Sequence, residues 1–370
     1  MKYENDERIV MTLDAGGTNF VFSAVQGNRV IVEPLHSPSF GDDLQKSLAA
    51  LRRGFTEIRS RLNQAPTAIS FSFPGPADFP NGIIGDLVNL PAYRGGVAIG
   101  PMLAHEFGLP VFINNDGDLF AYGEAIAGFL PQINDKLAAA GSPKRYENLL
   151  GITLGTGFGA GIVRRGELFL GDNAAAAEIW TFPNKFRPEK SAEEAVSIRG
   201  IRRFFAEHSG CAVDDSPSPK EIYEIAVGKR AGDREAALAT YQDFGVAVGH
   251  ALAYASSLID GLIVISGGIA GAASLFLLAL VQEMNGSLQL ADGSPIRRTE
   301  ALVYNLEEER DLSAFLRGDI HTVTVPGTTI AMRYDPLKRV GVGVSKLGAS
   351  AAMAVGAYAF ALHELDNLDR

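Results

Sequence analysis

The stretch Leu13-Asp-Ala-Gly-Gly-Thr-Asn19 decides how this chain is interpreted, because it places two glycines and a threonine between two apolar runs. The runs Ile9–Leu13 and Phe20–Val25 have the length and composition of strands, so the stretch between them is predicted to be a hairpin turn. Glycine permits positive φ and close approach of a ligand, so consecutive backbone N–H groups can converge on phosphate oxygens. A plain tight turn explains this one stretch equally well.

Two further glycine clusters follow apolar runs. The stretch Leu154-Gly-Thr-Gly-Phe-Gly-Ala-Gly161 follows Leu149–Thr153, while Ser266-Gly-Gly268 follows Leu262–Ile265 and precedes a helical stretch. Three such turns, two of which carry a threonine beside the glycines, favour a nucleotide phosphate site. The sequence contains no Gly-x-x-x-x-Gly-Lys-Ser/Thr, and its first glycine turn leads into a strand rather than a helix. These features disfavour P-loop enzymes and Rossmann dehydrogenases.

Composition narrows the class of protein. The 370 residues exceed the usual size of one hydrophobic core, which predicts two domains. With 33 basic and 43 acidic residues the net charge is −10, which disfavours nucleic acid or anionic lipid as a partner. The single cysteine, Cys211, excludes an internal disulfide framework and a multi-cysteine zinc site. The chain starts with polar residues, and its apolar stretches are shorter than the roughly 20 residues that span a bilayer. We expect a cytoplasmic protein.

The order of predicted elements repeats along the chain. Strands are predicted near 9–13, 20–25, 29–33, 68–73, 110–114, 149–154, 159–164, 167–170 and 262–265. Helices are predicted near 43–62, 98–107, 117–127, 193–208, 233–258, 269–283 and 346–365. Each half opens with three strands and a Gly-Thr turn, which predicts two related α/β domains, 1–128 and 129–345. The alanine-rich last helix is expected to pack on the first domain, so that 346–370 joins it, and the polar segment 131–148 is a connection or surface insertion.

Asp116 is the first candidate for chemistry. The stretch Val111-Phe-Ile-Asn-Asn-Asp-Gly117 places Asn115 and Asp116 at the carboxyl end of a predicted strand, where ligands gather in open α/β sheets. Asp116 can be the N-cap of the helix 117–127, and it can also take the proton from a hydroxyl that attacks phosphorus. The two roles are compatible, because a carboxylate at a helix N-terminus stays ionised. Asp118 competes for the catalytic role but lies inside the predicted helix.

Two more carboxylates have notable settings. Glu178 lies among small and apolar neighbours, with no residue nearby in the sequence to balance its charge. Glu193 lies at the start of the helix predicted over 193–208, where it or Glu194 can simply complement the helix dipole. Carboxylates suit sugar hydroxyls because they accept two hydrogen bonds in fixed geometry. The histidines have no spacing typical of a metal site or a catalytic triad.

Together these motifs resemble the ROK family of sugar kinases, part of the actin/hexokinase/Hsp70 superfamily. The resemblance covers most of residues 8–283 and resumes at Lys346-Leu-Gly-Ala349. It implies two ribonuclease-H-like (actin-like ATPase) α/β domains that face each other across a cleft. It also implies ATP and Mg²⁺ as cofactors and transfer of the γ-phosphate to a hexose hydroxyl, O6 in expectation. The motifs that occur in the family's order are Leu13-Asp-Ala-Gly-Gly-Thr-Asn19, Phe73-Pro-Gly-Pro76, Asn89-Leu-Pro91, Asn115-Asp116, Leu154-Gly-Thr-Gly157 and Ser266-Gly-Gly268.

The resemblance also assigns residues to roles. Asp116 matches the family's catalytic base, and Asp14 matches a carboxylate that acts indirectly on the Mg²⁺–phosphate assembly. The residues expected to bind the sugar are Gly75, Asn89, Asn115, Asp116, Glu178, Thr181 and Glu193. Those expected to bind ATP are Asp14, Gly16, Gly17, Thr18, Asn19, Gly155, Thr156, Gly157, Gly267 and Gly268.

The chain departs from the family pattern in three places. Trp180-Thr181 replaces the Gly-His that follows the family's sugar-binding Glu. The Cys-x-Cys-Gly-x-x-Gly-Cys zinc loop is missing from the sequence, so we predict no zinc. Residues 285–345 are longer and more strand-rich than the family norm, which fits extra oligomer contacts or a loop at the edge of the cleft.

Two other functions were weighed against a kinase. ROK members include sugar-responsive transcriptional regulators, but these carry a helix-turn-helix ahead of the first phosphate motif, where this sequence has about thirteen residues before Asp14. A non-catalytic sugar sensor is disfavoured by Asn115-Asp116 and the two phosphate loops. Glucose is the default hexose, with N-acetylated hexosamines, mannose and fructose behind it. The resemblance further implies a homodimer.

Overall fold

A computed structural model describes residues 2–16, 18–75, 77–85 and 90–368 of the chain. Contacts between Cα atoms group the chain into two compact units. The first comprises Met1–Pro131, Gly161–Ala176 and Lys346–Arg370, and the second comprises Gln132–Ala160 and Ala177–Ser345. These units describe packing alone, so the assignment of functional domains to 1–128 with 346–370 and to 129–345 stays a prediction.

The first unit contains a six-stranded sheet of order β3-β2-β1-β5-β8, in which β4 also pairs with β2. β1 runs antiparallel to β2 and parallel to β5, which is parallel to β8. The strands predicted for this part of the chain are confirmed. β4 was not predicted, because its stretch is polar and shows no alternation of apolar and polar residues. The strands are β1 (Val10–Ala15), β2 (Asn19–Gln26), β3 (Arg29–Val30), β4 (Leu35–Pro38), β5 (Ala68–Ser72) and β8 (Val111–Asn114). A separate small ribbon pairs β6 (Ala77–Asp78) with β7 (Ile83–Ile84).

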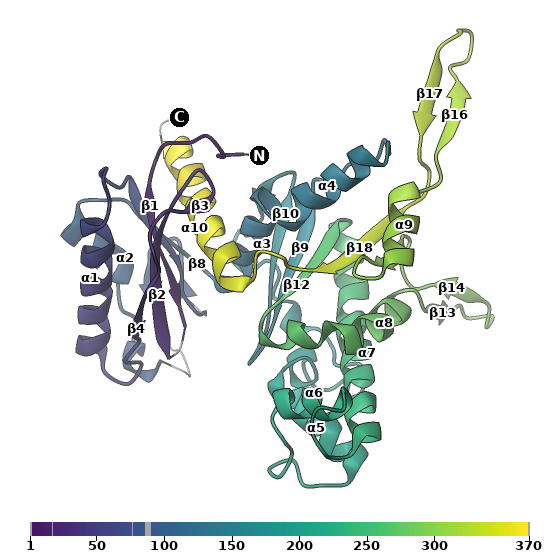
Figure 1. The fold of residues 1–370 in the computed structure, drawn as a ribbon, viewed down its shortest axis with the longest axis horizontal. Coiled ribbons are helices and arrows are strands. Elements are labelled where there is room, and N and C mark those ends of the chain that lie inside the picture. The colour runs from purple at the N-terminus through teal and green to yellow at the C-terminus, as the bar shows by residue number, and fades with distance from the viewer. Residues whose placement is uncertain (1, 17, 76, 86–89, 369–370) are drawn as a thin grey trace. The chain divides into compact units, whose positions relative to one another are not determined.

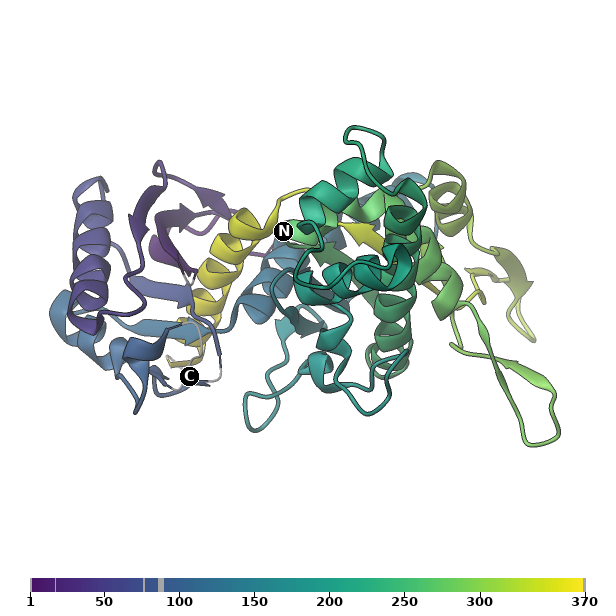
Figure 2. The same ribbon diagram turned by 90° about the horizontal axis from the view of Figure 1, so that it is seen from below.

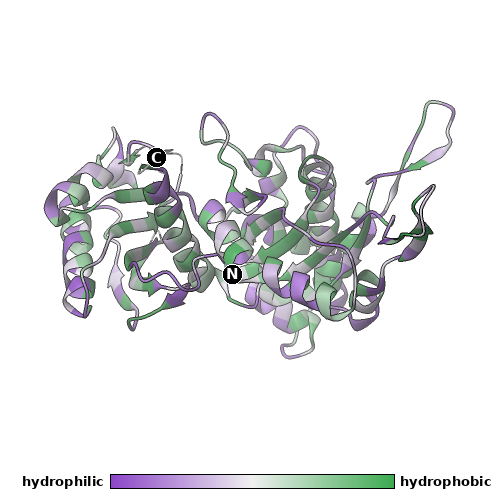
Figure 3. Cartoon of the chain, turned by 90° about the horizontal axis from the view of Figure 1, so that it is seen from above, coloured by the Kyte–Doolittle hydropathy of each residue, from purple (hydrophilic) through white to green (hydrophobic). Residues whose placement is uncertain are grey.

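One face of this sheet carries the apolar core of the unit. Alternate residues such as Leu13 and Phe71 pack with Phe55 of α1 (Leu44–Ser60) and Leu103 of α2 (Ile99–Phe107). Figures 1 and 2 show α1 and α2 on this side of the strands, with α10 (Ala349–Leu368) on the other. In Figure 3 the strands are largely hydrophobic green, as this packing requires. A 3₁₀ helix, η1 (Pro91–Tyr93), adds a buried tyrosine.

The opposite face is covered by α10, which in turn packs on α3 (Asp116–Ile126). Tyr358 and Leu362 of α10 pack on Val10 and Ala68, which lie side by side on β1 and β5. The prediction that the last helix packs on the first domain's sheet is therefore confirmed for the first unit.

A second six-stranded sheet has the order β11-β10-β9-β12-β18-β15. Its first five strands repeat the order of the first sheet, which agrees with the predicted duplication. β12 is parallel to both of its neighbours, β9 and β18, and β18 is also parallel to β15. The strands are β9 (Leu149–Leu154), β10 (Phe158–Arg164), β11 (Glu167–Leu168), β12 (Leu262–Ser266), β15 (Leu302–Asn305) and β18 (Arg339–Val344). The helices of the second unit include α5 (Ile198–Ser209), α6 (Pro219–Ala226), α7 (Arg234–Ile259) and α8 (Ala273–Met284), with 3₁₀ helices η2 (Ile179–Thr181), η3 (Ala192–Glu194) and η4 (Gly268–Ala272).

Two predictions on boundaries were wrong. The stretch 131–148 begins with the end of a helix, α4 (Phe129–Ala139), rather than being only a connection. The helix predicted over 193–208 is a 3₁₀ turn at η3 followed by α5, because the Ser197 side chain caps α5 by accepting a hydrogen bond from the Gly200 N–H.

Residues 285–345 are strand-rich, as predicted. Between α8 and β18 they form two hairpins, β15 and the helix α9 (Glu309–Arg317). The hairpins are β13 (Ser287–Gln289) with β14 (Pro295–Arg297), and β16 (His321–Thr324) with β17 (Ala331–Tyr334). Figure 1 shows both hairpins extending outward from the body of the unit. None of the helices in the described part of the chain is both long and apolar enough to cross a membrane.

Candidate functional site

In the first unit, three polar residues line up at the carboxyl ends of neighbouring parallel strands. Asp14 of β1 is in register with Ser72 of β5, which is in register with Asn114 of β8. Carboxyl ends of parallel strands share one edge of the sheet, where α/β proteins bind ligands. Ser72 Oγ and Asn114 Nδ2 are buried and have no hydrogen-bond partner among the described residues. Unpartnered buried polar atoms are rare in native proteins and favour a bound water or ligand at this edge.

The first glycine turn closes the hairpin between β1 and β2. The Gly16 N–H donates to the Asn19 carbonyl at 2.9 Å, and Thr18 is exposed. Gly17, the other glycine of the turn, lies outside the described residues. The turn therefore has the predicted hairpin geometry, and its side chains Thr18 and Asn19 are accessible to a ligand.

Asp14 is half-buried at the end of β1, and the Ser350 hydroxyl donates to its Oδ2 at 3.0 Å. Burial raises the pKa of the Asp14 carboxyl above its ordinary value. The hydrogen bond from Ser350 acts against this rise, and the negative charge of Asp116 adds to it. Asp14 and Asp116 are therefore close enough to influence each other's ionisation.

Asp116 is the first residue of α3, so the N-cap role that the sequence allowed for it belongs to another residue. The cap is Asn115, whose Oδ1 accepts from the Asp118 N–H at 2.6 Å and whose Nδ2 donates to Asp118 Oδ2 at 2.9 Å. Asp116 is thus free of the capping role. Its Oδ1 accepts from the Gly117 N–H at 2.8 Å, and the residue is exposed.

Desolvation by the surrounding protein raises the pKa of Asp116, while hydrogen bonds from the backbone N–H groups of Gly117 and of Asp116 itself lower it. Because water reaches the exposed side chain, we expect this rise to be modest. A carboxylate of this kind, accessible and with a raised pKa, suits a general base. Asp118, the competitor for this role, is buried and engaged with Asn115.

The remaining predicted residues of the first unit differ in how well they are defined. Gly75 is exposed after β5, on the same chain segment as Ser72. Asn115 lies directly beside Asp116, although both ends of its side-chain amide are used in capping. Asn89 lies outside the described residues.

In the second unit, two glycine turns lie at the same edge of the sheet. β9 and β12 are parallel, with Thr153 opposite Ser266, so the turns that follow them begin side by side. Gly267 has φ +96°, and a Cβ there would be 2.4 Å from the Leu154 carbonyl oxygen, which only glycine tolerates. At Gly155 and Gly268 an added Cβ would meet no described atom within 4 Å. The two turns thus pack against each other and leave space beside the Cα atoms of Gly155 and Gly268, although the Gly155 N–H itself donates to the Gly157 carbonyl.

Glu193 contacts one of these turns. Its Oε2 accepts a hydrogen bond from the Phe158 N–H at 3.1 Å, and its Oε1 accepts one from Arg199 at 3.0 Å. A Cβ at Gly157 would be 2.8 Å from Glu193 Oε2, so glycine makes room for the carboxylate. The structure therefore joins a predicted sugar-binding acid to the predicted ATP-binding turn.

Glu178 precedes η2 and is exposed. Its Oε2 accepts a hydrogen bond from the Trp180 indole N–H, and its carbonyl oxygen accepts one from the Thr181 hydroxyl at 2.7 Å. This indole contact could not be predicted from the family pattern, because Trp180 stands where the resemblance expects glycine. Trp180 and Thr181 therefore orient Glu178 locally.

Three further residues at these edges, Ser350, Phe158 and Arg199, were not predicted from the sequence. Ser350 contacts Asp14 from 336 positions along the chain, which no local pattern reveals. Phe158 and Arg199 bind the Glu193 carboxylate, one through its backbone and one through its guanidinium. For Ser350 the only sequence indication was its place directly after the recurring stretch Lys346-Leu-Gly-Ala349.

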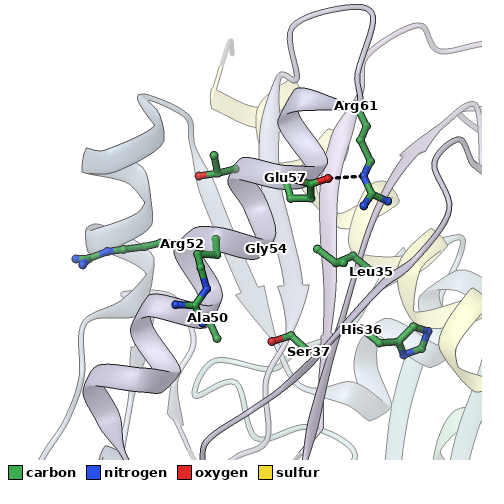
Figure 4. A pocket seen from close by; sticks show the side chains of 10 residues that line it. Leu35, His36, Ser37, Ala50, Arg52, Gly54, Glu57 and Arg61 are labelled. Carbon is green, nitrogen blue, oxygen red and sulfur yellow. Dashed lines mark hydrogen bonds and ion pairs between the residues drawn. The ribbon is translucent and has the colours of Figure 1, made fainter.

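A large hollow in the first unit lies away from the predicted residues. It has a volume of about 620 Å³ and lies between α1 and β4. Figure 4 shows that the side chains of Arg52 and Arg61 on its rim point apart. Arg61 pairs with Glu57, and Arg52 pairs with Glu106. Arg52 and Arg61 are thus neutralised by separate carboxylates and do not converge on a ligand.

The two sheets and the glycine turns at their edges define the class of protein. Two sheets with one strand order, each with glycine turns at a sheet edge, form the two-domain α/β architecture of actin-like ATPases. The ROK family model matches residues 10–303, so the chain belongs to the ROK family.

Individual relatives agree with this family. The chain is 55% identical to a glucokinase from Parabacteroides distasonis of known crystal structure, with a TM-score of 0.87 over 98% of this chain and 99% of that one. It is 25% identical to glucokinase from Thermotoga maritima, over 71% of this chain and 83% of that protein. It is 32% identical to N-acetyl-D-glucosamine kinase from Vibrio cholerae over 45% of this chain, and that match spans 50% of the relative's length.

Proposed function

We propose that this chain is an ATP-dependent hexose kinase that transfers the γ-phosphate of ATP to a sugar hydroxyl, O6 in expectation. Membership of the ROK family and 55% identity to a glucokinase support the activity. The observation that carries the proposal is Asp116, an accessible carboxylate at the carboxyl end of β8 beside Asp14. The regulator and the non-catalytic sensor are less favoured, because the named relatives are sugar kinases.

Asp116 would serve as the general base. Phosphoryl transfer needs a group that accepts the proton of the attacking hydroxyl and holds that oxygen in line with the phosphate. The Gly117 N–H fixes one oxygen of the Asp116 carboxylate, and the side chain remains exposed to an incoming hydroxyl. The pKa of Asp116, raised by desolvation, brings its basicity closer to that required near neutral pH.

The residues near Asp14 suit Mg²⁺, which needs few protein ligands, better than a metal ion whose ligands all come from the protein. The described residues contain no cluster of three or more His, Cys, Asp or Glu side chains that could hold a metal ion. Mg²⁺ commonly takes one or two carboxylates and fills its other positions with water and phosphate oxygens. Asp14, whose Oδ2 accepts a hydrogen bond from the Ser350 hydroxyl at 3.0 Å, offers such a hard oxygen donor. When bound, Mg²⁺ neutralises negative charge on the phosphates. The absence of zinc stays a prediction.

ATP would be held mainly by backbone. The turns at Gly155–Gly157 and Gly267–Gly268 lie side by side at one sheet edge, and Thr156 is exposed beside them. The Gly155 N–H already donates to the Gly157 carbonyl at 3.1 Å, so the phosphate contacts would fall to the other N–H groups of these turns. Backbone N–H groups of this kind bind phosphate oxygens without a side-chain charge. Gly16 and Thr18 would contribute a second phosphate turn from the first unit.

On the family resemblance, the residues that would bind the sugar are Asn115, Asp116, Glu178, Thr181 and Glu193. Of the hexoses, we propose glucose, because the 55% identical relative is a glucokinase. The Vibrio cholerae relative makes N-acetylglucosamine the second candidate. We further propose a cytoplasmic homodimer, on the family resemblance alone.

Product analysis tests the sugar and the position of transfer. Purified protein with Mg²⁺ and ATP is supplied separately with glucose and N-acetylglucosamine, and kcat/KM is measured for each. We expect a higher kcat/KM for glucose and a product that glucose-6-phosphate dehydrogenase oxidises. Preference for N-acetylglucosamine would overturn the choice of sugar, and a glucose phosphate that the dehydrogenase does not oxidise would overturn transfer to O6.

A further inference from the structure

Helix α10 contacts the candidate site from the far end of the chain. Ser350, in its first turn, donates its hydroxyl proton to Asp14 Oδ2 at 3.0 Å. Among the described residues, this is the hydrogen bond that fixes the Asp14 side chain. The contact links the end of β1, beside the first glycine turn, to a helix more than 300 residues later.

The rest of α10 is held firmly on the same sheet. Tyr358 packs on Val10, and its hydroxyl accepts a hydrogen bond from the Gly27 N–H at 3.0 Å. Near the other end of the helix, Arg8 forms an ion pair with Asp366 at 2.7 Å. Because α10 is anchored along β1 and β2, its first turn is a fixed point from which Ser350 can hold Asp14.

α10 also packs closely on α3, the helix that begins with Asp116. A Cβ added at Gly356 would be 1.8 Å from the Leu119 carbonyl oxygen, and one at Gly123 would be 1.9 Å from the Ala352 carbonyl oxygen. The two helix backbones are therefore in direct contact, without intervening side chains. A helix pair packed this closely has little freedom to slide.

From these contacts we propose that Ser350 is a positioning residue, which holds the Asp14 carboxylate at a fixed place relative to Asp116 through the packed helices α10 and α3. The inference rests on the proposed kinase function and extends it to a residue outside the ATP and sugar motifs. Ser350 itself need not touch the substrate. It holds Oδ2 of Asp14, which would leave Oδ1 available to the Mg²⁺–phosphate assembly when that is bound.

The alternative is that Ser350 only stabilises the start of α10. An exposed serine hydroxyl at a helix start commonly satisfies local polar groups. That role predicts that removing the hydroxyl lowers stability and affects every kinetic constant similarly. The positioning role predicts a selective effect on nucleotide and Mg²⁺.

The test compares Ser350→Ala, which removes the hydroxyl, with Ser350→Thr, which retains it. Ser60→Ala is the matched control, since Ser60 is an exposed helical serine of the same unit that bonds only to the Glu57 carbonyl. For each variant we measure kcat, the KM values for ATP and glucose, and the half-saturating Mg²⁺ concentration. Isothermal calorimetry of ADP binding at several Mg²⁺ concentrations gives a readout independent of turnover, and thermal unfolding reports stability.

In Ser350→Ala we expect the half-saturating Mg²⁺ concentration and the KM for ATP to rise about 3- to 10-fold, the range for losing one hydrogen bond of typical net strength. Mg²⁺-dependent ADP binding should weaken by a similar factor. The KM for glucose and the melting temperature should match wild type, and Ser350→Thr should restore nucleotide binding to within about twofold.

Wild-type nucleotide and Mg²⁺ constants in Ser350→Ala would overturn the positioning role. So would a uniform loss in all constants accompanied by a lower melting temperature. If the wild-type protein itself fails to phosphorylate any hexose, the proposed function fails. The calorimetric comparison would then still show whether Ser350 affects Mg²⁺-dependent nucleotide binding.

Discussion

The Glu193 carboxylate accepts a hydrogen bond from the Phe158 N–H at 3.1 Å, so an acid predicted to bind sugar supports the turn predicted to bind ATP. Gly157 makes room for this contact. A change at Glu193 should therefore affect both substrates, although the motifs assign it to one.

We expect Glu193→Ala to raise the KM for glucose and also the KM for ATP, because the Phe158 N–H loses its acceptor. Each loss should be about 3- to 10-fold. Glu193→Gln retains an oxygen acceptor for Phe158, so its ATP constant should stay near wild type. Glu194→Gln is the control, since Glu194 pairs with Arg203 and Arg199 and has no bond to the turn. A normal KM for ATP in Glu193→Ala would contradict this coupling.

Asp116→Asn should abolish phosphoryl transfer while leaving sugar binding largely intact. The amide keeps the shape of the side chain but cannot accept a proton, and we expect kcat to fall by about a thousandfold. ADP release measures turnover, and the rise in melting temperature on adding glucose measures binding. Asp78→Asn is the matched control, since Asp78 ends the short strand β6 and accepts a hydrogen bond from the Asn81 side chain. Turnover in Asp116→Asn within tenfold of wild type would remove the base assignment.

The same carboxylate should set the acidic limb of the pH–rate profile. A general base must be ionised, so activity rises with pH through the pKa of Asp116. Since desolvation raises this pKa, we expect the midpoint of the limb to lie above the ordinary aspartate value of about 3.9. kcat/KM for glucose measured between acidic and neutral pH gives the midpoint. A midpoint at or below the ordinary value would conflict with the surroundings of Asp116.

Gly356→Ala should destabilise the first unit, because its Cβ would lie 1.8 Å from the Leu119 carbonyl oxygen. We expect a loss of about 3 kcal/mol in the free energy of unfolding, as for overpacked cores. Gly271→Ala is the control, since its Cβ would meet no described atom within 4 Å. Urea unfolding measures both. If Gly356→Ala is as stable as the control variant, α10 and α3 do not pack as closely as the structure has them.

Asp335 and Arg339 form a buried ion pair at the base of the β16–β17 hairpin. Their side chains are 1% and 0% exposed, and Arg339 donates to Asp335 at 2.5 Å. Asp335 also accepts hydrogen bonds from the backbone N–H groups of Asp319 and Leu337, both at 3.1 Å. Asp335→Ala leaves Arg339 buried without its partner, and we expect a loss of about 3–5 kcal/mol in urea unfolding. The double variant Asp335→Leu with Arg339→Met replaces the ion pair by apolar side chains and should recover most of the lost free energy of unfolding. An equal loss in the double variant and in Asp335→Ala would contradict this explanation.

The ion pair also predicts how stability varies with pH. Burial acts to raise the pKa of Asp335, but the hydrogen bonds from Arg339, Asp319 and Leu337 and the charge of Arg339 outweigh it, so the pKa is lowered. A lowered pKa contributes stability above the pKa of the unfolded chain, which is lost as pH falls through the folded value. Stability should therefore drop below about pH 4. The double apolar variant should show a shallower drop, and an equal drop would assign the acid sensitivity to other carboxylates.

Local sequence pattern predicted much of this fold. The strand predicted over 149–154 matches β9, and the glycine turn after 14 is the hairpin that the two apolar runs required. These features depend on residues close in sequence, namely apolar period and glycine at a turn. The start of α5 was misplaced because Ser197 caps the helix after a separate 3₁₀ turn, a competition between two helical forms that composition does not resolve.

The parts that sequence could not supply depend on distant residues. Ser350 reaches Asp14 only because α10 returns to β1, and Glu193 reaches Phe158 only because η3 folds back on the β9–β10 turn. The sequence allowed the cap of α3 one residue late, since Asn115 and Asp116 are both good capping residues and only the backbone angles distinguish them. The chemistry of their side chains identified Asp14 and Glu193 as candidate site residues, but their hydrogen-bond partners depend on tertiary packing.

The most direct test of the account is ADP release by the purified protein with Mg²⁺ and ATP, measured with and without each of glucose, N-acetylglucosamine, mannose and fructose. The account predicts sugar-dependent release of ADP, fastest with glucose and lost in Asp116→Asn. No sugar-dependent release with any of the four hexoses would contradict it.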